Sequence, residues 1–401
     1  MEYIRTAMRE YATGPDVMLV YDGRSGNLLV EGADTDTVTV QIVAHVFEET
    51  AEEADKAMAR IVDGITHNER QLTIRPPEPA SQGAWFFQFN RGMRVDYAVT
   101  APHNTQCQLD ARSGRIEVTR VAGPVRVQQK SGRTSIRSVS SDIQVVTRSG
   151  AVDLEEIGGS VVVQAASGRI MVRGAGGDVS IQSASGGVRV EQVAGSLSVE
   201  SASGRVEAVE ISGPARLQAA SGRVSLAGAA SRAELHSVSG AVKFQGPVRG
   251  DLDVRSTSGS VHLDVDPAHP FFIDAETQSG ALRSDLEARS GDAPPREGAP
   301  RVKVRTLSGS IRIGRADPVV IAIALGKERH GIHFGGPPDE EWAERLREKT
   351  ERFRAHAEAR AEHMRDRVEA RAERHRMRAE RHARGEAGDD ADFDELDVEI
   401  L

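Results

Sequence analysis

Arginine residues recur at one position of a repeated Ser-Gly motif, two residues after the serine. They are Arg115, Arg133, Arg169, Arg205 and Arg223. Guanidinium groups held in a row can bind carboxylate or phosphate groups, often through two hydrogen bonds each. The row therefore predicts a basic edge that binds an anionic polymer, a lipid headgroup or the acidic residues of a partner. A row of solvated surface side chains is the alternative interpretation.

Other residues that could take part in catalysis lack the arrangement that catalysis requires. The repeated serines do not lie in a Gly-x-Ser-x-Gly elbow, and a residue shared by every repeat is typical of a structural role. Asp153, Glu155 and Glu156 lie close together, as acids do in polysaccharide-active β-helix enzymes. Arg137 and Arg173, each eighteen residues from Glu155, are expected to pair with it. We predict a non-enzymatic protein without catalytic residues, cofactor or metal, and keep a polysaccharide-active enzyme as an alternative.

The positions of all these residues depend on a repeat. Ser-Gly pairs begin at Ser113, Ser131, Ser149, Ser167, Ser185, Ser203, Ser221 and Ser239, at intervals of eighteen residues, and continue at Ser258, Ser279 and Ser308. A constant interval of this size is typical of a solenoid, in which each repeat forms one coil. Within each coil, apolar residues alternate in two short segments, as in strands with one buried face. The sequence predicts a mainly β fold, a two-sided parallel β-solenoid with about 18 residues per coil.

The interval also predicts which residues become neighbours, because residues eighteen apart should lie above one another at about the 4.8 Å strand spacing. The expected columns include Arg137, Glu155, Arg173 and Glu191, the pair Arg216 and Glu234, and the amides of Gln164 and Gln182. Glycine at each corner is expected to adopt positive φ, and serine to bond locally or to the serine of the next coil. The longer interval between Ser279 and Ser308 predicts a loop that leaves a mid-coil corner.

Residues 1–110 are expected to form an α+β cap that merges into the first coil, because an open solenoid end would expose unpaired strands. The expected elements are an imperfect coil from Ser25, strands at 37–46, 71–76 and 93–102, and a helix that buries Ala54, Met58, Ile61 and Ile65. Cys107 is expected to point into the core with Leu109.

Beyond the solenoid at 111–326, the sequence predicts a linker at 327–338, a long charged helix at 339–384 and an acidic tail at 385–401. The apolar residues expected to mediate self-association are Trp342, Leu346, Phe353, Met364, Val368, Leu396, Val398 and Ile400. Those of the helix follow an eleven-residue repeat. The helix could pack along the solenoid, pair with a second helix as a coiled coil, or stand free. The tail could add a strand to an exposed edge, and a disordered tail is the alternative.

Charge, cysteine content and apolar runs restrict function and location. Residues 385–401 contain eight acids and no base, so removing them from the net charge of −9 leaves −1. No global positive field therefore favours nucleic acid. A single cysteine excludes an internal disulfide, the N-terminus lacks a signal-peptide pattern, and no apolar run reaches the length of a membrane span. We predict a cytoplasmic protein without a transmembrane segment, with peripheral membrane association left open.

The segment from Ser25 to about Gly314 resembles the bacterial putative-adhesin family of β-strand-repeat proteins, a domain of unknown function. The resemblance rests on SGNLLVEG, the helix-bearing cap, YAVTAP before the array, and the series SGRIEV, SGRVEA and SGRVSL. It implies a non-enzymatic β-solenoid with adhesion or envelope-associated roles, although this chain lacks the export signal of secreted members. We predict a homo-oligomeric scaffold for protein partners that self-associates through its helix or end coils. A filament of stacked end coils is the alternative.

Overall fold

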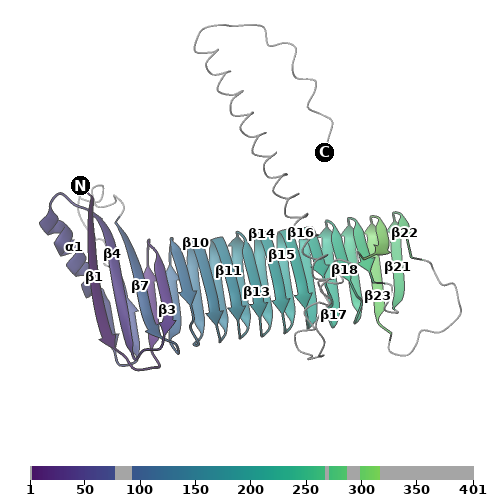
Figure 1. Ribbon diagram of the computed structural model, residues 1–401. Helices are drawn as coiled ribbons and strands as arrows, with labels where there is room; N and C mark the ends of the chain where they lie inside the picture. The colour runs from purple at the N-terminus through teal and green to yellow at the C-terminus, as the bar shows by residue number, and fades with distance from the viewer. Residues whose placement is uncertain (1, 77–92, 267–270, 287–298, 317–401) are drawn as a thin grey trace, which may run out of the picture. The chain divides into compact units, whose positions relative to one another are not determined.

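The computed structural model describes residues 2–76, 93–266, 271–286 and 299–316. These residues form a stack of parallel β-coils with an α+β cap at its N-terminal end (Figure 1). The fold expected for this part of the chain is confirmed. The last expected solenoid residues, 317–326, and the linker, helix and tail that follow lie outside the described residues.

Each coil consists of two strand segments that meet at the Ser-Gly pair. We call the sheet formed by the segments before each pair the first face, and the sheet formed by the segments after each pair the second face. The strands of the coils are β2 (Met18–Gly23), β3 (Leu28–Ala33), β8 (Gln106–Ala111), β9 (Arg115–Thr119), β10 (Val125–Val139), β11 (Ile143–Ile157), β12 (Val161–Ser167), β13 (Ile170–Ala175), β14 (Val179–Val193), β15 (Leu197–Ile211), β16 (Pro214–Ala227), β17 (Arg232–Ser239), β18 (Val242–Gly246), β19 (Leu252–Ser258), β20 (Val261–Val265), β21 (Phe272–Ser279), β22 (Leu282–Ser284), β23 (Arg301–Ser308) and β24 (Ile311–Arg315). Strands β10, β11, β14, β15 and β16 continue through the corner and contribute to both faces.

The predicted stacking of residues eighteen apart is confirmed. Ser167 pairs with Ser185, and Ile170 pairs with Val188, whose exposure is 1%. Inward side chains of successive coils form continuous apolar rows, one of which contains Val127, Val145, Val163, Ile181 and Val199. Because β-branched side chains fit the pleated surface of strands, the core consists mainly of valine, isoleucine and leucine, with few aromatic residues such as Tyr21, Tyr97 and Phe244.

The Ser-Gly corner repeats because one backbone conformation and one hydrogen bond recur in the coils from Ser113 to Ser221. Gly186 has φ of 118°, and a Cβ at this position would collide with the carbonyl oxygen of Gly168 one coil away. The Ser185 hydroxyl donates to the carbonyl oxygen of Ala166 at 3.4 Å. The acceptor one coil away is therefore a main-chain carbonyl rather than the next serine, which corrects one of the expected partners.

The corner opposite the Ser-Gly pair contains a residue in the left-handed conformation, seven positions after the serine. In five coils this residue is not glycine: Arg120, Ser138, Glu156, Gln192 and Glu210 have φ between 53° and 60°. A left-handed non-glycine residue costs roughly 1–2 kcal/mol. Hydrogen bonds between the left-handed residues of neighbouring coils offset part of this cost. For example, the Ser138 hydroxyl donates to Glu156 Oε2 at 2.8 Å. The repeat pattern does not predict this column because its residue types differ between coils.

The cap confirms the expected α+β composition. Its elements are β1 (Glu2–Ala12), β4 (Thr37–Phe47), α1 (Ala51–Asp63), β5 (Ile65–Asn68), β6 (Gln71–Ile74) and β7 (Arg94–Pro102). The Thr50 hydroxyl caps α1 by accepting a hydrogen bond from the Glu53 backbone N–H at 3.2 Å. Helix α1 buries Ala54, Met58 and Ile61 as predicted and contacts β1, β4 and β5. It therefore covers the N-terminal end of the core.

Two features of the cap differ from expectation. The helix ends at Asp63, so Ile65, expected on its buried face, lies in β5 and is buried there. Strand β1 has no counterpart among the expected elements, and it pairs antiparallel with β4. Cys107 is buried beside the solenoid core, as predicted.

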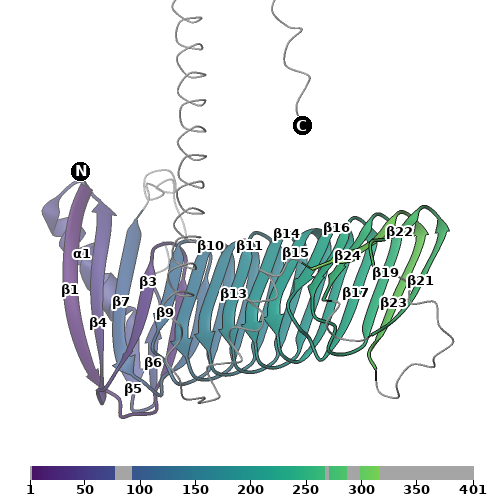
Figure 2. The same cartoon turned by 45° about the vertical axis from the view of Figure 1, so that its right-hand side comes forward.

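The chain does not stack its coils in sequence order at either end. In the cap, the coil of β2 and β3 lies between β6 and β7 on one side and β8 and β9 on the other. Near the C-terminal end, β19 pairs with β23 and β20 with β24, whereas β21 and β22 form the outermost coil (Figure 2). The expected order, in which the coil of Ser279 follows that of Ser258, is therefore wrong. Val302 and Val304 pair with Leu252 and Val254 in the same register relative to their Ser-Gly pairs.

Candidate functional site

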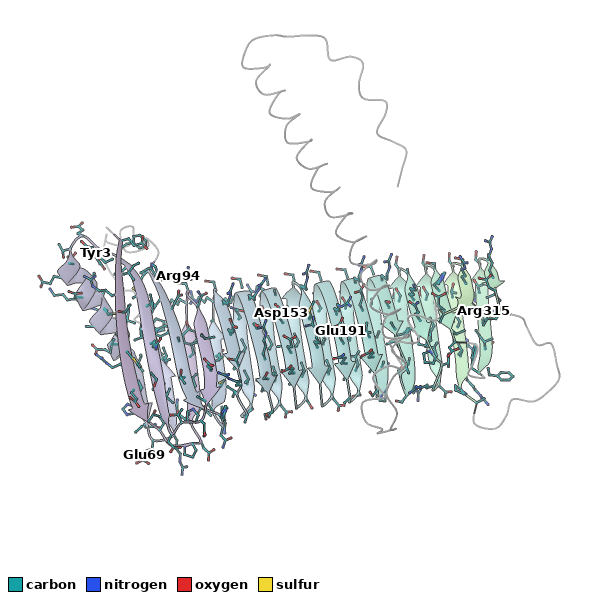
Figure 3. The ribbon with its side chains drawn as sticks, in the orientation of Figure 1. Tyr3, Glu69, Arg94, Asp153, Glu191 and Arg315 are labelled. Atoms are coloured by element: carbon teal, nitrogen blue, oxygen red, sulfur yellow. The ribbon has the colours of Figure 1, made fainter. Side chains whose placement is uncertain are left out.

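The second face carries a network of ion pairs in the predicted register. The network contains Arg137, Glu155, Arg173, Glu191, Arg189, Glu207 and Arg205. Glu155 accepts from Arg173 at 2.7 Å and lies 3.3 Å from Arg137 Nε. Glu191 extends from the same face (Figure 3). Burial raises the pKa of the Glu191 carboxyl, but hydrogen bonds from Arg189 and Arg173 outweigh this effect and lower its pKa.

Two of the three acids that resembled a catalytic cluster have partners on neighbouring coils. Glu155 lies between two arginines as predicted, and Glu156 accepts a hydrogen bond from Ser138. In the described ranges, no group of three His, Cys, Asp or Glu side chains is placed to hold a metal ion. No helix within the same ranges is both long and apolar enough to cross a membrane.

The five predicted arginines lie in one column beside the Ser-Gly corners. Arg133 pairs with Arg115, and Arg205 pairs with Arg223. Ala151 occupies the same column next to Arg133, and Gly187 occupies it next to Arg205, which also lies 3.6 Å from Glu207. The side chains of the other four make no ion pair with any described residue. The structure therefore brings the predicted row together, with two interruptions.

A second basic column lies on the other side of the same corners and was missed in the sequence. Arg112, Lys130 and Arg148 directly precede Ser113, Ser131 and Ser149. All three are exposed, and none forms an ion pair within the part of the chain that the structure describes. The sequence indicates this column by a basic residue directly before each of three consecutive Ser-Gly pairs. We define the basic edge as Arg112, Lys130 and Arg148 together with Arg115, Arg133 and Arg169.

None of the six cations of the basic edge forms an ion pair with a described residue. It extends over the coils from Ser113 to Ser167, a length of roughly 14 Å at about 4.8 Å per coil. Arg115 and Arg133 are direct cross-strand neighbours, an arrangement that is destabilising for like charges. A bound anion would relieve this repulsion, so the edge is a candidate site for negatively charged groups.

The outermost coil exposes side chains that occupy inward positions elsewhere. Ile273 pairs with Val302 and Leu282 pairs with Ile311. Val302 and Ile311 are fully buried, whereas Ile273 is 36% and Leu282 50% exposed. No described strand pairs with the outer side of β21 or β22. This end coil therefore has both a free strand edge and an apolar surface.

The residues predicted to mediate self-association lie outside the described residues. They are Trp342, Leu346, Phe353, Met364, Val368, Leu396, Val398 and Ile400. Their role stays a prediction from the sequence.

Comparisons with known proteins give one matching sequence family and several solved structures of low similarity. The sequence profile described as Toastrack DUF4097 matches residues 27–314. No curated protein matches the chain. Among solved structures, a putative cell adhesion protein from Clostridium sporogenes is 9% identical, with 79% of this chain and 100% of that chain covered and a TM-score of 0.22. A putative adhesin from Bacteroides fragilis is 11% identical, with 77% and 97% covered and a TM-score of 0.25. A putative lipid binding protein from Parabacteroides distasonis is 13% identical, with 77% and 96% covered and a TM-score of 0.27. Similarities of this size carry no information on function.

Proposed function

We propose, since the chain belongs to the Toastrack DUF4097 family and its solenoid spans the matched region, that this protein is a non-enzymatic scaffold for protein partners. The scaffold binds an acidic segment of a partner along the basic edge. The observation that carries the proposal is the gathering of six exposed cations, none with an ion-pair partner among the described residues, at one row of corners.

The geometry of the edge favours an extended acidic segment. An extended chain advances about 3.3–3.6 Å per residue, so roughly 14 Å of edge accommodates about four residues. Arginine can hold a carboxylate through two parallel N–H donors, and five of the six cations are arginines. Because the two columns flank the corner, carboxylates on alternate sides of such a segment would each meet a cation.

Charge reversal at the basic edge tests this function. In wild-type protein, a fluorescein-labelled oligoglutamate peptide should bind, as measured by fluorescence anisotropy, and should dissociate as NaCl is added. The variant with Arg133→Glu and Arg169→Glu should bind at least about tenfold more weakly, because two attractive contacts become repulsive. Arg223→Glu is the matched control, since Arg223 lies in the same column but Ala220, not a base, precedes its Ser-Gly pair.

Two results would contradict the proposed partner. Unchanged peptide affinity in the double variant would show that the basic edge is not the binding site. Binding to phosphatidylglycerol vesicles without binding to the peptide would assign the edge to a lipid surface instead.

The scaffold also self-associates through the end coil of β21 and β22. Two copies meet through identical C-terminal ends, because each of these ends has both a free strand edge and an apolar surface. Two such ends related by a twofold axis would pair their β21 edges and cover Ile273 and Leu282. A head-to-tail filament would instead pair β21 with the free edge of β1, which pairs with no described strand other than β4, and its mass would rise with protein concentration.

If two copies associate through their end coils, charged substitutions in the end coil should lower the molecular mass in solution. The variant with Ile273→Lys and Leu282→Lys should shift from dimer to monomer in light scattering coupled to size-exclusion chromatography, because a lysine is costly to bury in the interface. Leu307→Lys is the control, since Leu307 is 49% exposed on the neighbouring strand β23 but points out from the first face. An unchanged mass in the double variant, or an equal shift in the control, would contradict the end-coil dimer.

A further inference from the structure

A shallow groove runs along the first face. It shares no residue with the basic edge, but its column of alanines continues the column of Arg112, Lys130 and Arg148. It lies between two outward columns, one formed by the residues three positions before each serine and one by the residues directly before it. The groove has a volume of about 1270 Å³ and extends from the coil of Val146 to the outermost coil, at Glu276. At about 4.8 Å per coil, its length is roughly 40 Å. It is therefore long, narrow and perpendicular to the strands.

The two walls of its middle section differ in chemistry. One wall contains Gln164 and Gln182, which are cross-strand neighbours and are exposed. Neither amide has a hydrogen-bond partner among the residues that the structure describes. The opposite wall contains Ala184 and Ala202. Because alanine side chains are short, this wall is low, and the hollow follows from the alanine column.

We infer that the first-face groove binds a linear, neutral polysaccharide. Amide groups repeated at the strand spacing can donate to and accept from the hydroxyl groups of a sugar chain. The alanine methyl groups offer apolar contacts to the C–H surfaces of sugar rings. The groove presents no free strand edge, so it lacks the main-chain hydrogen bonds by which strand addition holds a peptide.

The charge and polarity of the groove disfavour other linear ligands. The lining contains two acids, Glu200 and Glu276, and two bases, Arg255 and Arg305, so a polymer with charges of one sign would be repelled over part of its length. An acyl chain would cover Gln164 and Gln182 without replacing their hydrogen bonds to water, which costs free energy. A neutral sugar chain satisfies both walls.

The groove is built to hold a polysaccharide and not to hydrolyse it by the two-carboxylate mechanism. That mechanism needs carboxylates about 5–9.5 Å apart. The acids among the groove-lining residues are Glu200 and Glu276, which are separated by five coil steps, or roughly 24 Å. The expected result of binding is an unchanged polysaccharide.

Native-gel retardation by hydroxyethylcellulose, with isothermal titration of cellohexaose, tests the inference. Wild-type protein should be retarded and should bind the oligosaccharide. The variant with Ala184→Leu and Ala202→Leu, which fills the groove, and the variant with Gln164→Ala and Gln182→Ala, which removes the amides, should each lose at least about tenfold in affinity. Ala241→Leu is the control, because Ala241 follows Gly240 toward the second face and does not line the groove.

Several results would overturn the inference. One is that the wild-type protein binds neither hydroxyethylcellulose nor cellohexaose. Another is that the variant with Ala184→Leu and Ala202→Leu binds cellohexaose as tightly as the wild-type protein, with an unchanged circular dichroism spectrum. The third is that cellohexaose is cleaved to shorter oligosaccharides during incubation. If a fatty acid displaces cellohexaose, and the substitutions at Ala184 and Ala202 also weaken binding of the fatty acid, the groove would be assigned to acyl chains. The basic-edge variant with Arg133→Glu and Arg169→Glu should bind cellohexaose normally, so failure here is independent of the proposed function.

Discussion

Gly186→Ala is expected to lower the free energy of unfolding by about 3 kcal/mol or more, whereas Gly187→Ala, one residue later, should leave it unchanged or raise it by up to about 1 kcal/mol. The two substitutions are chemically identical. Their opposite outcomes follow from the position of each glycine relative to the coil beside it.

The reason lies in the backbone of the Ser-Gly corner. Gly186 has φ of 118°, where alanine is strained, and a Cβ would collide with the carbonyl oxygen of Gly168. Because that atom belongs to the main chain of the neighbouring coil, relief requires the coils to separate, which also breaks the hydrogen bond from Ser185 to Ala166. At Gly187, a Cβ would meet no atom within 4 Å. Alanine there only reduces the freedom of the unfolded chain.

Urea unfolding followed by circular dichroism measures both variants under the same conditions. In a stack of coils, each coil is stabilised mainly by its neighbours, so damage at the middle of the array should also reduce the cooperativity of unfolding. Equal stability of the two variants would mean that the Ser-Gly corner is not a close contact between coils.

Alkaline pH is expected to destabilise the protein strongly, with the free energy of unfolding steady below about pH 9 and falling above it. Burial raises the pKa of the Cys107 thiol from 9.0 to about 12. Burial, followed by the charges of Asp96 and Asp22, raises the pKa of Tyr21 from 10.0 to about 12. Burial and then Tyr21 raise the pKa of Tyr97 as well.

The sign of the effect follows from proton binding. Each of these groups keeps its proton in the folded protein at pH values where the unfolded chain has released it, so higher pH favours unfolding. The stability contributed by Cys107 is complete below pH 9 and is lost as the pH rises toward 12. Near pH 11, Cys107 alone should account for a loss on the order of 2–3 kcal/mol.

Urea unfolding at a series of pH values checks the alkaline loss, and two variants assign it. Cys107→Ala and Tyr97→Phe should each flatten the decline above pH 9. Tyr97→Phe should cost little at neutral pH, because its buried hydroxyl has no hydrogen-bond partner within the described part of the chain. The ring would keep its edge contact with Tyr21 at 5.8 Å. Constant stability from pH 8 to pH 11 would refute the prediction.

The repeat in the sequence was sufficient to predict the coil, its register and the ion pairs among Arg137, Glu155, Arg173 and Glu191. Residues eighteen apart must become neighbours once two strands and two corners make a coil, so Glu155 between Arg137 and Arg173 follows from counting. The same counting placed Arg115 and Arg133 in one column. Arg112, Lys130 and Arg148 could have been found in the same way, as bases before consecutive Ser-Gly pairs.

The groove could not be predicted from residue types alone. Gln164 and Gln182 were expected to be neighbours, but the hollow beside them depends on how far the short alanine side chains rise from the curved first face. The depth of the groove is therefore a property of the folded surface. The left-handed conformation of Arg120 and Glu156 likewise follows from the turn that the chain must make at this corner of the coil. Residues of different types adopt it at the equivalent position of other coils.

The repeating unit follows from the amino-acid sequence alone, whereas the order of the coils at the two ends is visible only in the folded chain. Any coil of this period can pair with any other, because the main-chain hydrogen bonds are the same. The choice at the C-terminal end follows apolar content: inward positions hold Val304 and Ile313 in the inner coil but Ala275 and Ser284 in the outer one. The more apolar coil gains more from being covered on both sides, so it takes the inner place although it comes later in the chain.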